Sequence, residues 1–287
     1  MQLEKEIGIL SVFCPLPKNM ANHNPERQTV LISGLPGSMA TLVAGRVSEA
    51  PDLSLYNIAF SSERGVENYP ALEFGSKLIT LVPPSLHEST LRLHRSGVII
   101  AVDFTRLDVV NRNAEFFAEA GVPFVMGTTG GDREKLLETV RRSRISAVIA
   151  SNMATPVILV QAILEHAAQT FPNALEGWVS GLYETDQQPI PENVGGPAIR
   201  DWRPFLEALG ATMSDGKPSN QVDPTFQVVG LINLMSPDGK AGMGMNYLIK
   251  NRGVNAEGTL RAIRFLAEKV RAGSQGEVFS MIDVLKG

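Results

Sequence analysis

The chain has 287 residues, of which 44% are hydrophobic and 20% are charged, and its formal net charge is −4. These values are typical of a globular protein with one large or two medium domains, and they exclude a disordered chain. The absence of a basic run argues against nucleic acid as a partner, and no apolar run reaches the ~20 residues that span a membrane. The single cysteine, Cys14, excludes an intramolecular disulfide and a cysteine-based metal site, so we expect a cytoplasmic protein that holds no metal.

The first part of the chain predicts an extension followed by β-α-β units. Residues 1–28 are interpreted as an N-terminal extension, because their first residues are too acidic for a signal peptide and no small-residue cleavage site follows. Short apolar runs then alternate with amphipathic ones, the pattern of a parallel sheet covered by helices. Two of these helices have clear ends, Gly121 after one and the N-cap Asp132 before another. Strands are predicted at 29–33, 55–60, 77–82, 98–104, 123–127 and 146–151.

The pattern changes after Asn152. An apolar helix is predicted over 156–169, and the alternation in GWVSGLYET (177–185) predicts a half-buried strand. Further strands are expected within 225–232 and 245–251, and a last amphipathic helix over 256–270.

Three short motifs follow predicted strands, where a doubly wound sheet binds its ligand. GLPGSMA (34–40) offers Gly34 for a tight turn and Gly37 for the approach of a phosphate to the backbone. By itself it is equally read as a glycine-rich turn without a ligand. AVDFT (101–105) lies at the end of the strand predicted over 98–104. GTTGG (127–131) follows the strand predicted over 123–127, and its small residues let a flat ring lie against the backbone.

Taken together, these motifs resemble dihydrodipicolinate reductase, in particular its plant and cyanobacterial branch. The likeness rests on Gly34-x-x-Gly37-x-Met39, on Asp103-Phe104-Thr105 and especially on VPFVMGTTGGDREKL (122–136). It continues through 171–185, 255–259 and 281–285 and so covers about residues 28–287.

The resemblance implies an α/β fold in which a Rossmann-like, doubly wound parallel sheet is joined to a second, α+β mixed-sheet domain. It implies a dinucleotide-binding domain over 29–152, a substrate-binding and oligomerisation domain over 153–257, and a C-terminal helix and tail, 258–287, that packs back on the first domain. The expected partners are a small-molecule substrate and further copies of the chain, as a homotetramer or alternatively a homodimer.

The resemblance also implies NADPH or NADH as the cofactor. The glycine turn would hold the pyrophosphate and the GTTG segment would lie beside the nicotinamide. The implied cofactor contacts are Gly34, Gly37, Ser38, Met39, Gly127, Thr128, Thr129 and Gly130, more loosely Asp103, Phe104 and Thr105, and Asn152 at the domain junction. Two departures weaken the turn, since Ser38 replaces a basic residue of the family and Ala40 its last glycine.

The end of the second predicted strand bears on the choice between the two cofactors. An acidic residue there favours NAD, but the sequence is AFSSERG, in which Ser61 and Arg64 are available for a 2′-phosphate. NADPH is therefore allowed, although the same residues also fit a solvated loop.

The loop after the strand at 177–185 departs from the family. The family pattern there has a histidine and a lysine for proton donation and substrate binding, followed by a Ser-Gly-Thr turn that binds a carboxylate. Here these positions hold Asp186, Ile190 and Val194-Gly195-Gly196. No histidine follows His166, and no lysine or arginine lies within 177–199.

This substitution predicts a substrate that is neutral, cationic or more apolar than a dicarboxylate. Asp186 is a candidate counter-ion, or a general acid if burial raises its pKa, and is equally read as a turn residue. Tyr183 is a second possible proton donor, although an aromatic residue on such a strand is often part of the core. The family pattern places Arg252 near the substrate pocket. A salt bridge between domains or subunits is the alternative role for this residue. The remaining candidates for substrate contact are Glu184, Gln187, Gly195 and Gly196.

Three functions stay open at this point. The first is an NAD(P)H-dependent reductase of a different unsaturated substrate, an imine or iminium, in a specialised biosynthetic pathway. The second is a non-redox descendant, either a cyclase or isomerase or a protein of assembly or regulation. The third, which the missing histidine and lysine disfavour, is a true dihydrodipicolinate reductase.

Overall fold

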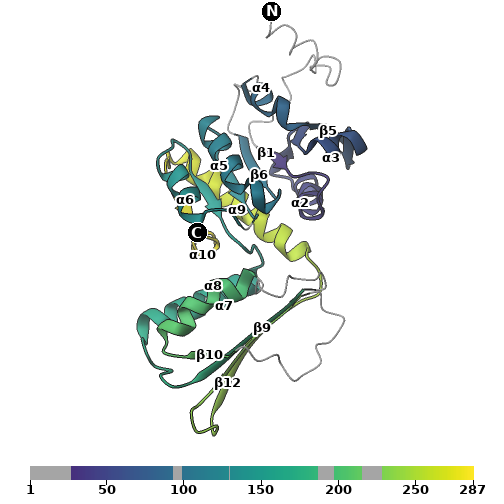
Figure 1. The fold of residues 1–287 in the computed structure, drawn as a ribbon. Coiled ribbons are helices and arrows are strands. Elements are labelled where there is room, and N and C mark those ends of the chain that lie inside the picture. Colours follow the sequence, from purple (N-terminus) through teal and green to yellow (C-terminus); the bar gives the residue numbers. More distant parts are fainter. Residues whose placement is uncertain (1–26, 93–98, 129, 187–196, 215–227) are drawn as a thin grey trace, which may run out of the picture. The chain divides into compact units, whose positions relative to one another are not determined.

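The computed structural model describes residues 27–92, 99–128, 130–186, 197–214 and 228–287, which fall into two compact units (Figure 1). Unit 1 contains the described residues up to Ala150 together with Thr259–Ser280 and Gly287, and unit 2 contains the described residues of Ser151–Gly258 together with Met281–Lys286. The long helix α9 (Gly253–Arg271) begins in unit 2 and continues in unit 1.

Unit 1 is built on a mainly parallel sheet whose strand order is β13-β8-β7-β6-β1-β3-β5-β4, with β2 also paired to β1. From β1 the chain first winds outward through β3 and β5, and then returns to β6 and winds outward the other way. This reversal between β1 and β6 is the topological switch of a doubly wound sheet. The strands are β1 (Gln28–Ser33), β2 (Leu53–Leu55), β3 (Ile58–Phe60), β4 (Ala71–Phe74), β5 (Lys77–Val82), β6 (Ile99–Asp103), β7 (Phe124–Met126), β8 (Ala147–Ile149) and β13 (Val278–Phe279).

Both faces of this sheet are covered because its strands are apolar on both sides. On one face, Ala101 and Phe124 pack with Val110 and Phe117 of α5 and with Leu136 of α6 in one buried cluster. The alternation of a strand sends its other residues to the opposite face, where α2 contacts β1 and β2. The helical segments of unit 1 are α2 (Ser38–Glu49), α3 (Glu63–Asn68), η1 (Pro84–Leu86), α4 (His87–Arg92), η2 (Leu107–Val109), α5 (Val110–Glu119) and α6 (Arg133–Arg141).

Polar contacts fix α9 beside the amino ends of β1 and β2. Arg264 of α9 forms a paired contact with Asp52, Nε to Oδ2 at 2.7 Å and Nη2 to Oδ1 at 2.9 Å. About two helical turns further along α9, Arg271 donates to the Gln28 side chain at 3.3 Å.

Unit 2 contains a mixed sheet of order β10-β9-β11-β12, in which β9, β11 and β12 are antiparallel and β10 runs parallel to β9. Helices α7 and α8 cover one face, and their contact with the sheet is centred on Trp202, whose ring meets Tyr247 edge-on at 5.5 Å. The elements are α7 (Thr155–Thr170), β9 (Val179–Asp186), α8 (Pro197–Ala208), β10 (Thr212–Ser214), β11 (Val228–Met235), β12 (Gly242–Ile249) and α10 (Met281–Lys286).

The predicted fold class is confirmed, while several local predictions need correction. The strand predicted over 55–60 is wrong as one element, because β2 ends at Leu55 and β3 begins at Ile58. Between them Tyr56 donates to the Val30 carbonyl and the Asn57 carbonyl accepts from Thr80, so the chain changes neighbours there. The strands β4, β10 and β13 were not predicted, since each is only two to four residues long.

Candidate functional site

The motifs predicted from the sequence meet at the carboxyl edge of the unit 1 sheet. Ser33 of β1 is paired with Asp103 of β6, Asp103 with Met126 of β7, and Ser33 also with Phe60 of β3. The residues that follow these strand ends are therefore neighbours. Gly34 donates its backbone N–H to Phe60, Phe104 to Ser33 and Gly127 to Asp103, each at 2.9 to 3.0 Å.

The glycine turn lies at the switch between β1 and β6. Gly34 has a φ of +113°, and a Cβ atom there would lie 2.7 Å from the carbonyl carbon of Phe104, so only glycine fits. The turn closes with a hydrogen bond of 2.8 Å from the Gly37 N–H to the Gly34 carbonyl.

Helix α2 begins directly after this turn with an uncapped N-terminus. Its N-cap is Gly37, no side chain caps its N–H groups, and its first turn has no acidic residue. Gly37 and Ser38 are exposed, whereas Met39 is half-buried. Free N–H groups at the positive end of a helix suit a phosphate, so this turn fits the pyrophosphate of a dinucleotide. By contrast, α6 is capped by the side chain of Asp132.

Phe104 connects the first motif to the third. Its carbonyl lies against Gly34, and its half-buried ring lies over Gly127, where a Cβ atom would come within 2.6 Å of the ring Cζ. The small residue at 127 therefore lets the ring approach the backbone.

Asp103 is fully buried behind the same edge, with its side chain at 0% exposure. Its Oδ1 accepts hydrogen bonds from the hydroxyls of Thr105 and Thr128 at 2.8 and 3.0 Å, and its Oδ2 accepts one from the Asn113 amide at 2.8 Å. Burial raises the pKa of the Asp103 carboxyl, and these hydrogen bonds act in the opposite direction. Two of the predicted cofactor residues, Thr105 and Thr128, are thus engaged with a third.

The far end of the turn after β7 is held by a residue that sequence reasoning missed. Asn111 of α5 accepts a hydrogen bond from the Asp132 N–H and donates one to the Asp132 carbonyl, both at 2.7 Å. Asn113 was missed as well. The available signal was the spacing NRN at the start of the predicted helix, where asparagines are unusual unless they bond to nearby loops. Gly130, with a φ of +133°, lies next to Leu107, and Thr129 lies outside the described residues.

The polar residues that follow β3 differ from one another in burial and contacts. Ser61 is buried and its hydroxyl donates to the Leu35 carbonyl at 2.5 Å, so this side chain supports the glycine turn from within. Ser62 caps the short helix α3 by accepting from the Gly65 N–H at 3.1 Å. Arg64 is exposed, and no acidic group in the described part of the chain forms an ion pair with it.

His87 lies against the same strand end. Its ring stacks on Phe60 with a centroid distance of 3.9 Å, and its Nε2 lies 3.1 Å from the Val82 carbonyl. Burial lowers the pKa of His87 to about 4, so this histidine is neutral at physiological pH.

Unit 2 contains the other predicted site residues. Asn152 caps the turn before α7, because its Oδ1 accepts from the Ala154 N–H at 2.9 Å, and Arg252 lies partly buried just before α9. Tyr183, Glu184 and Asp186 belong to strand β9, and Gln187, Gly195 and Gly196 lie outside the described residues.

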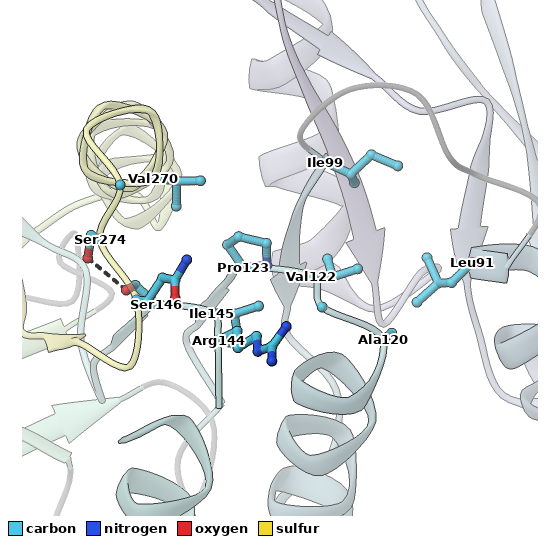
Figure 2. A pocket seen from close by; sticks show the side chains of 13 residues that line it. Leu91, Ile99, Ala120, Val122, Pro123, Arg144, Ile145, Ser146, Val270 and Ser274 are labelled. Atoms are coloured by element: carbon cyan, nitrogen blue, oxygen red, sulfur yellow. Dashed lines mark hydrogen bonds between the residues drawn. The ribbon is translucent and has the colours of Figure 1, made fainter. Parts of the chain in front are cut away.

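A pocket of about 280 Å³ lies at the amino edge of the unit 1 sheet, opposite the motifs (Figure 2). Its wall includes Pro123 and Val122 before β7, Ile145 before β8, and Ser146, whose hydroxyl lies 2.7 Å from that of Ser274. None of the predicted site residues lines it. In the described part of the chain, no cluster of histidine, cysteine or carboxylate side chains could hold a metal ion, and no helix is long and apolar enough to cross a membrane.

Comparison with known proteins decides the family. Residues 28–153 match the family model described as dihydrodipicolinate reductase, N-terminus. The chain is 32% identical, over 274 residues, to 4-hydroxy-tetrahydrodipicolinate reductase 1, chloroplastic, of Arabidopsis thaliana, an alignment that covers 90% of this chain and 78% of that protein. The chain belongs to the dihydrodipicolinate reductase family. It is therefore a member of an oxidoreductase family, with an N-terminal domain of the NAD(P)-binding type.

Two further relatives agree with this assignment. The chain is 32% identical to a probable 4-hydroxy-tetrahydrodipicolinate reductase 2, chloroplastic, of Oryza sativa, over 90% of this chain and 82% of that protein. A dipicolinate-bound dihydrodipicolinate reductase from Paenisporosarcina has the same fold with a TM-score of 0.60, at 17% identity, over 88% of this chain and 97% of that one. The resemblance found in the sequence motifs is confirmed.

Proposed function

We propose that this protein is an NAD(P)H-dependent reductase that transfers a hydride to an unsaturated substrate other than a dicarboxylate, an imine or iminium. One contrast supports the proposal: the turns of unit 1 keep the cofactor motifs, whereas residues 177–199 contain no lysine, arginine or histidine. A dicarboxylate entering that segment would meet Asp186 and Glu192 instead of cations. Each missing charge-assisted hydrogen bond costs ~1.5–3 kcal/mol.

The substrate side of the proposal rests on the same segment. Asp186 at the end of β9 is the counter-ion of an iminium or, when protonated, the general acid for an imine nitrogen. Tyr183 on that strand is the second candidate proton donor. The proposed substrate contacts are Glu184, Gln187, Gly195, Gly196 and Arg252.

Titration with NADPH and NADH, followed by fluorescence and calorimetry, is the first test. We expect micromolar binding of at least one nucleotide and its oxidation by neutral imines or iminium ions, but not by 4-hydroxy-tetrahydrodipicolinate. The absence of binding at millimolar nucleotide would overturn the reductase proposal in favour of a cyclase, isomerase or assembly protein.

Restoring the family residues tests the substrate assignment directly. We expect Asp186→His combined with Ile190→Lys to raise the rate of dicarboxylate reduction at least about tenfold, since a donor and a cation return to the pattern. Gln188→His combined with Pro189→Lys is the matched control, because it adds the same groups out of register. Equal gains in both variants would contradict the proposal.

A true 4-hydroxy-tetrahydrodipicolinate reductase is the second candidate. The names of the plant relatives at 31 to 32% identity favour it. Reduction of that dicarboxylate by the unmodified chain, at a rate above that for neutral imines, would establish it and overturn the first candidate.

We propose NADPH as the preferred nucleotide, on the basis of Arg64. This exposed guanidinium follows β3, where an arginine suits the 2′-phosphate and an acidic residue would suit the free ribose. Arg64→Ala should raise the Kd for NADPH about tenfold and leave that for NADH unchanged, since one charge-assisted hydrogen bond is lost. Arg142→Ala, which removes an exposed arginine at the C-cap of α6, is the control.

We further propose self-association, as a homotetramer or alternatively a homodimer, through the open face of the unit 2 sheet. This open face lies away from α7 and α8 and exposes Val179, Met235 and Leu248 at 44 to 49%. Met235→Lys with Leu248→Lys should convert the assembly to monomers in light scattering. Leu78→Lys, at an exposed position on β5, should not.

The compartment is also a proposal. We expected the cytoplasm from the sequence, but the plant relatives are named chloroplastic, and this favours a plastid. A fluorescent fusion of the whole chain in plant cells distinguishes the two locations.

A further inference from the structure

Two asparagines at the start of α5 hold different loops at the carboxyl edge of the unit 1 sheet. Asn113 donates to Asp103 Oδ2 at 2.8 Å and to Thr105 Oγ1 at 2.9 Å. Asn111 forms the reciprocal pair with the backbone of Asp132, both bonds at 2.7 Å. The first turn of α5 is therefore hydrogen-bonded both to the loop after β6 and to the far end of the loop after β7.

Asp103 completes the connection, because its other oxygen binds the near end of the loop after β7. Oδ1 accepts from the Thr128 hydroxyl at 3.0 Å and from the Thr105 N–H and hydroxyl at 3.2 and 2.8 Å. All the side-chain groups that bond this carboxylate in the described part of the chain are neutral donors. A buried carboxylate that depends on hydrogen bonds alone is sensitive to the polarity of every partner.

The three described glycines of the loop after β7 leave little room for adjustment. Gly127 lies under the Phe104 ring, and a Cβ atom on Gly130 would come within 3.0 Å of Leu107. Gly131, with a φ of +67°, packs against Asn111, where a Cβ atom would lie 3.3 Å from the amide carbon.

We infer that Asp103, Asn111 and Asn113 are positioning residues that hold the turn after β7 in the shape that receives the nicotinamide ring. This inference rests on the proposed NAD(P)H-dependent function. Hydride transfer tolerates little misplacement of the reacting carbon, and groups that touch the cofactor need supporting hydrogen bonds to keep their geometry. None of the three residues needs to touch the cofactor itself.

Exchanging the polarity of the Asp103–Asn113 pair tests the inference. Asp103→Asn leaves a single acceptor oxygen, which can serve either Asn113 or the two threonines but not both, and Asn113→Asp places two carboxylates together, so each single variant breaks part of the network. The double variant restores one donor and one acceptor with the original net charge. We expect each single variant to raise the Kd for NADPH at least tenfold and to change the emission of the bound nicotinamide, and the double variant to return to within threefold of the unmodified protein.

A fragment of the cofactor separates positioning from a general loss of structure. The nucleotide 2′,5′-ADP lacks the nicotinamide, so its Kd should be the same in all variants. Glu115→Gln is the control on the same helix, since Glu115 pairs with Lys135 of α6 at 2.7 Å.

The outcomes distinguish this inference from the proposal beneath it. If the unmodified protein binds neither nucleotide, the proposed function fails and the inference with it. If it binds NADPH and folded single variants bind equally well, or the double variant is no better than the singles, the inference alone is overturned. Should the buried variants fail to fold, Asn111→Asp at the outer attachment decides: it keeps the acceptor for Asp132 and loses the donor, and an unchanged NADPH Kd would contradict the inference.

Discussion

The strands of the two sheets in this protein are buried to different extents. All five residues of β6 in the unit 1 sheet are buried, whereas along β12 in the unit 2 sheet only Tyr247 and Ile249 are buried. A parallel sheet with helices on both faces gives near-continuous apolar strands, and an antiparallel sheet with one covered face gives alternating ones. The first sheet is therefore completed by its own chain, while the second leaves a face for something else to cover.

This difference bears on which residues near the candidate site can be exchanged without loss of the fold. The turns at the carboxyl edge of the first sheet are fixed by packing and by buried hydrogen bonds. Strand β9 belongs to the sheet with one open face, and it leads into the segment where the family pattern predicts a histidine and a lysine that this sequence lacks.

The largest expected effect tests the burial contrast with two aliphatic strand residues. Ile100→Ala on β6, where the side chain is 0% exposed, should lower the free energy of unfolding of unit 1 by about 4 kcal/mol through lost contacts and a cavity. Leu248→Ala on β12, at 48% exposure, should change it by less than about 0.5 kcal/mol in dilute protein.

The two units can be followed separately in urea. Both tryptophans, Trp178 and Trp202, belong to unit 2, so their fluorescence reports that unit while circular dichroism reports both. A large loss for Leu248→Ala that grows with protein concentration would show the open face to be part of an assembly. A large loss independent of concentration would contradict the contrast.

A somewhat smaller effect depends on pH and comes from His87. Its pKa in the folded state is about 4, below the ordinary 6.5, so folding favours the neutral ring. Its contribution is complete above pH 6.5 and is lost as the pH falls toward 4, by about 3 kcal/mol in total. His87→Gln should flatten the stability of unit 1 across this range, measured by urea unfolding at several pH values. The exposed His166→Gln in unit 2 is the control, and an equal flattening there would refute the assignment.

The smallest effect concerns the ion pair between α9 and the start of β2. Arg264 and Asp52 are 41% and 46% exposed, and exposed pairs contribute ~0.2–1 kcal/mol even in good geometry. Arg264→Ala should therefore lower stability by about 1 kcal/mol at low salt and less at high salt. Arg142→Ala removes a local pair between the C-cap of α6 and Glu138 four residues earlier, and should cost about 0.3 kcal/mol.

The parallel sheet could be predicted from the sequence because apolar runs mark its longer strands and glycines mark the turns that follow them. Strands such as β1 and β6, and the cap Asp132, were predictable from local patterns. The short pairings β4 and β13 were not, since they depend on distant neighbours: β13 exists only because it meets Ala147 and Val148 of β8. Burial of Ser61 was unpredictable for the same reason, because its partner Leu35 lies 26 residues away.

The turns of the candidate site could be predicted from the sequence, but the side chains that hydrogen-bond to these turns could not. Gly34, Phe104 and Gly127 follow strand ends and are found by motif. Asn111 and Asn113 act through side-chain geometry within a helix, which a helical pattern does not distinguish from a solvated face.

The packing of Gly34 against Phe104, and of Phe104 on Gly127, has a consequence for how this lineage should be compared. These glycines are required by the closure of the sheet edge, whether or not a nucleotide ever occupies it. Selection for folding alone would preserve them in a descendant that had abandoned redox chemistry. The exposed residues Ser38 and Arg64 would be free to change after such a loss. In a comparison of close relatives, the residues at these two positions are therefore better indicators of nucleotide binding than the glycines are.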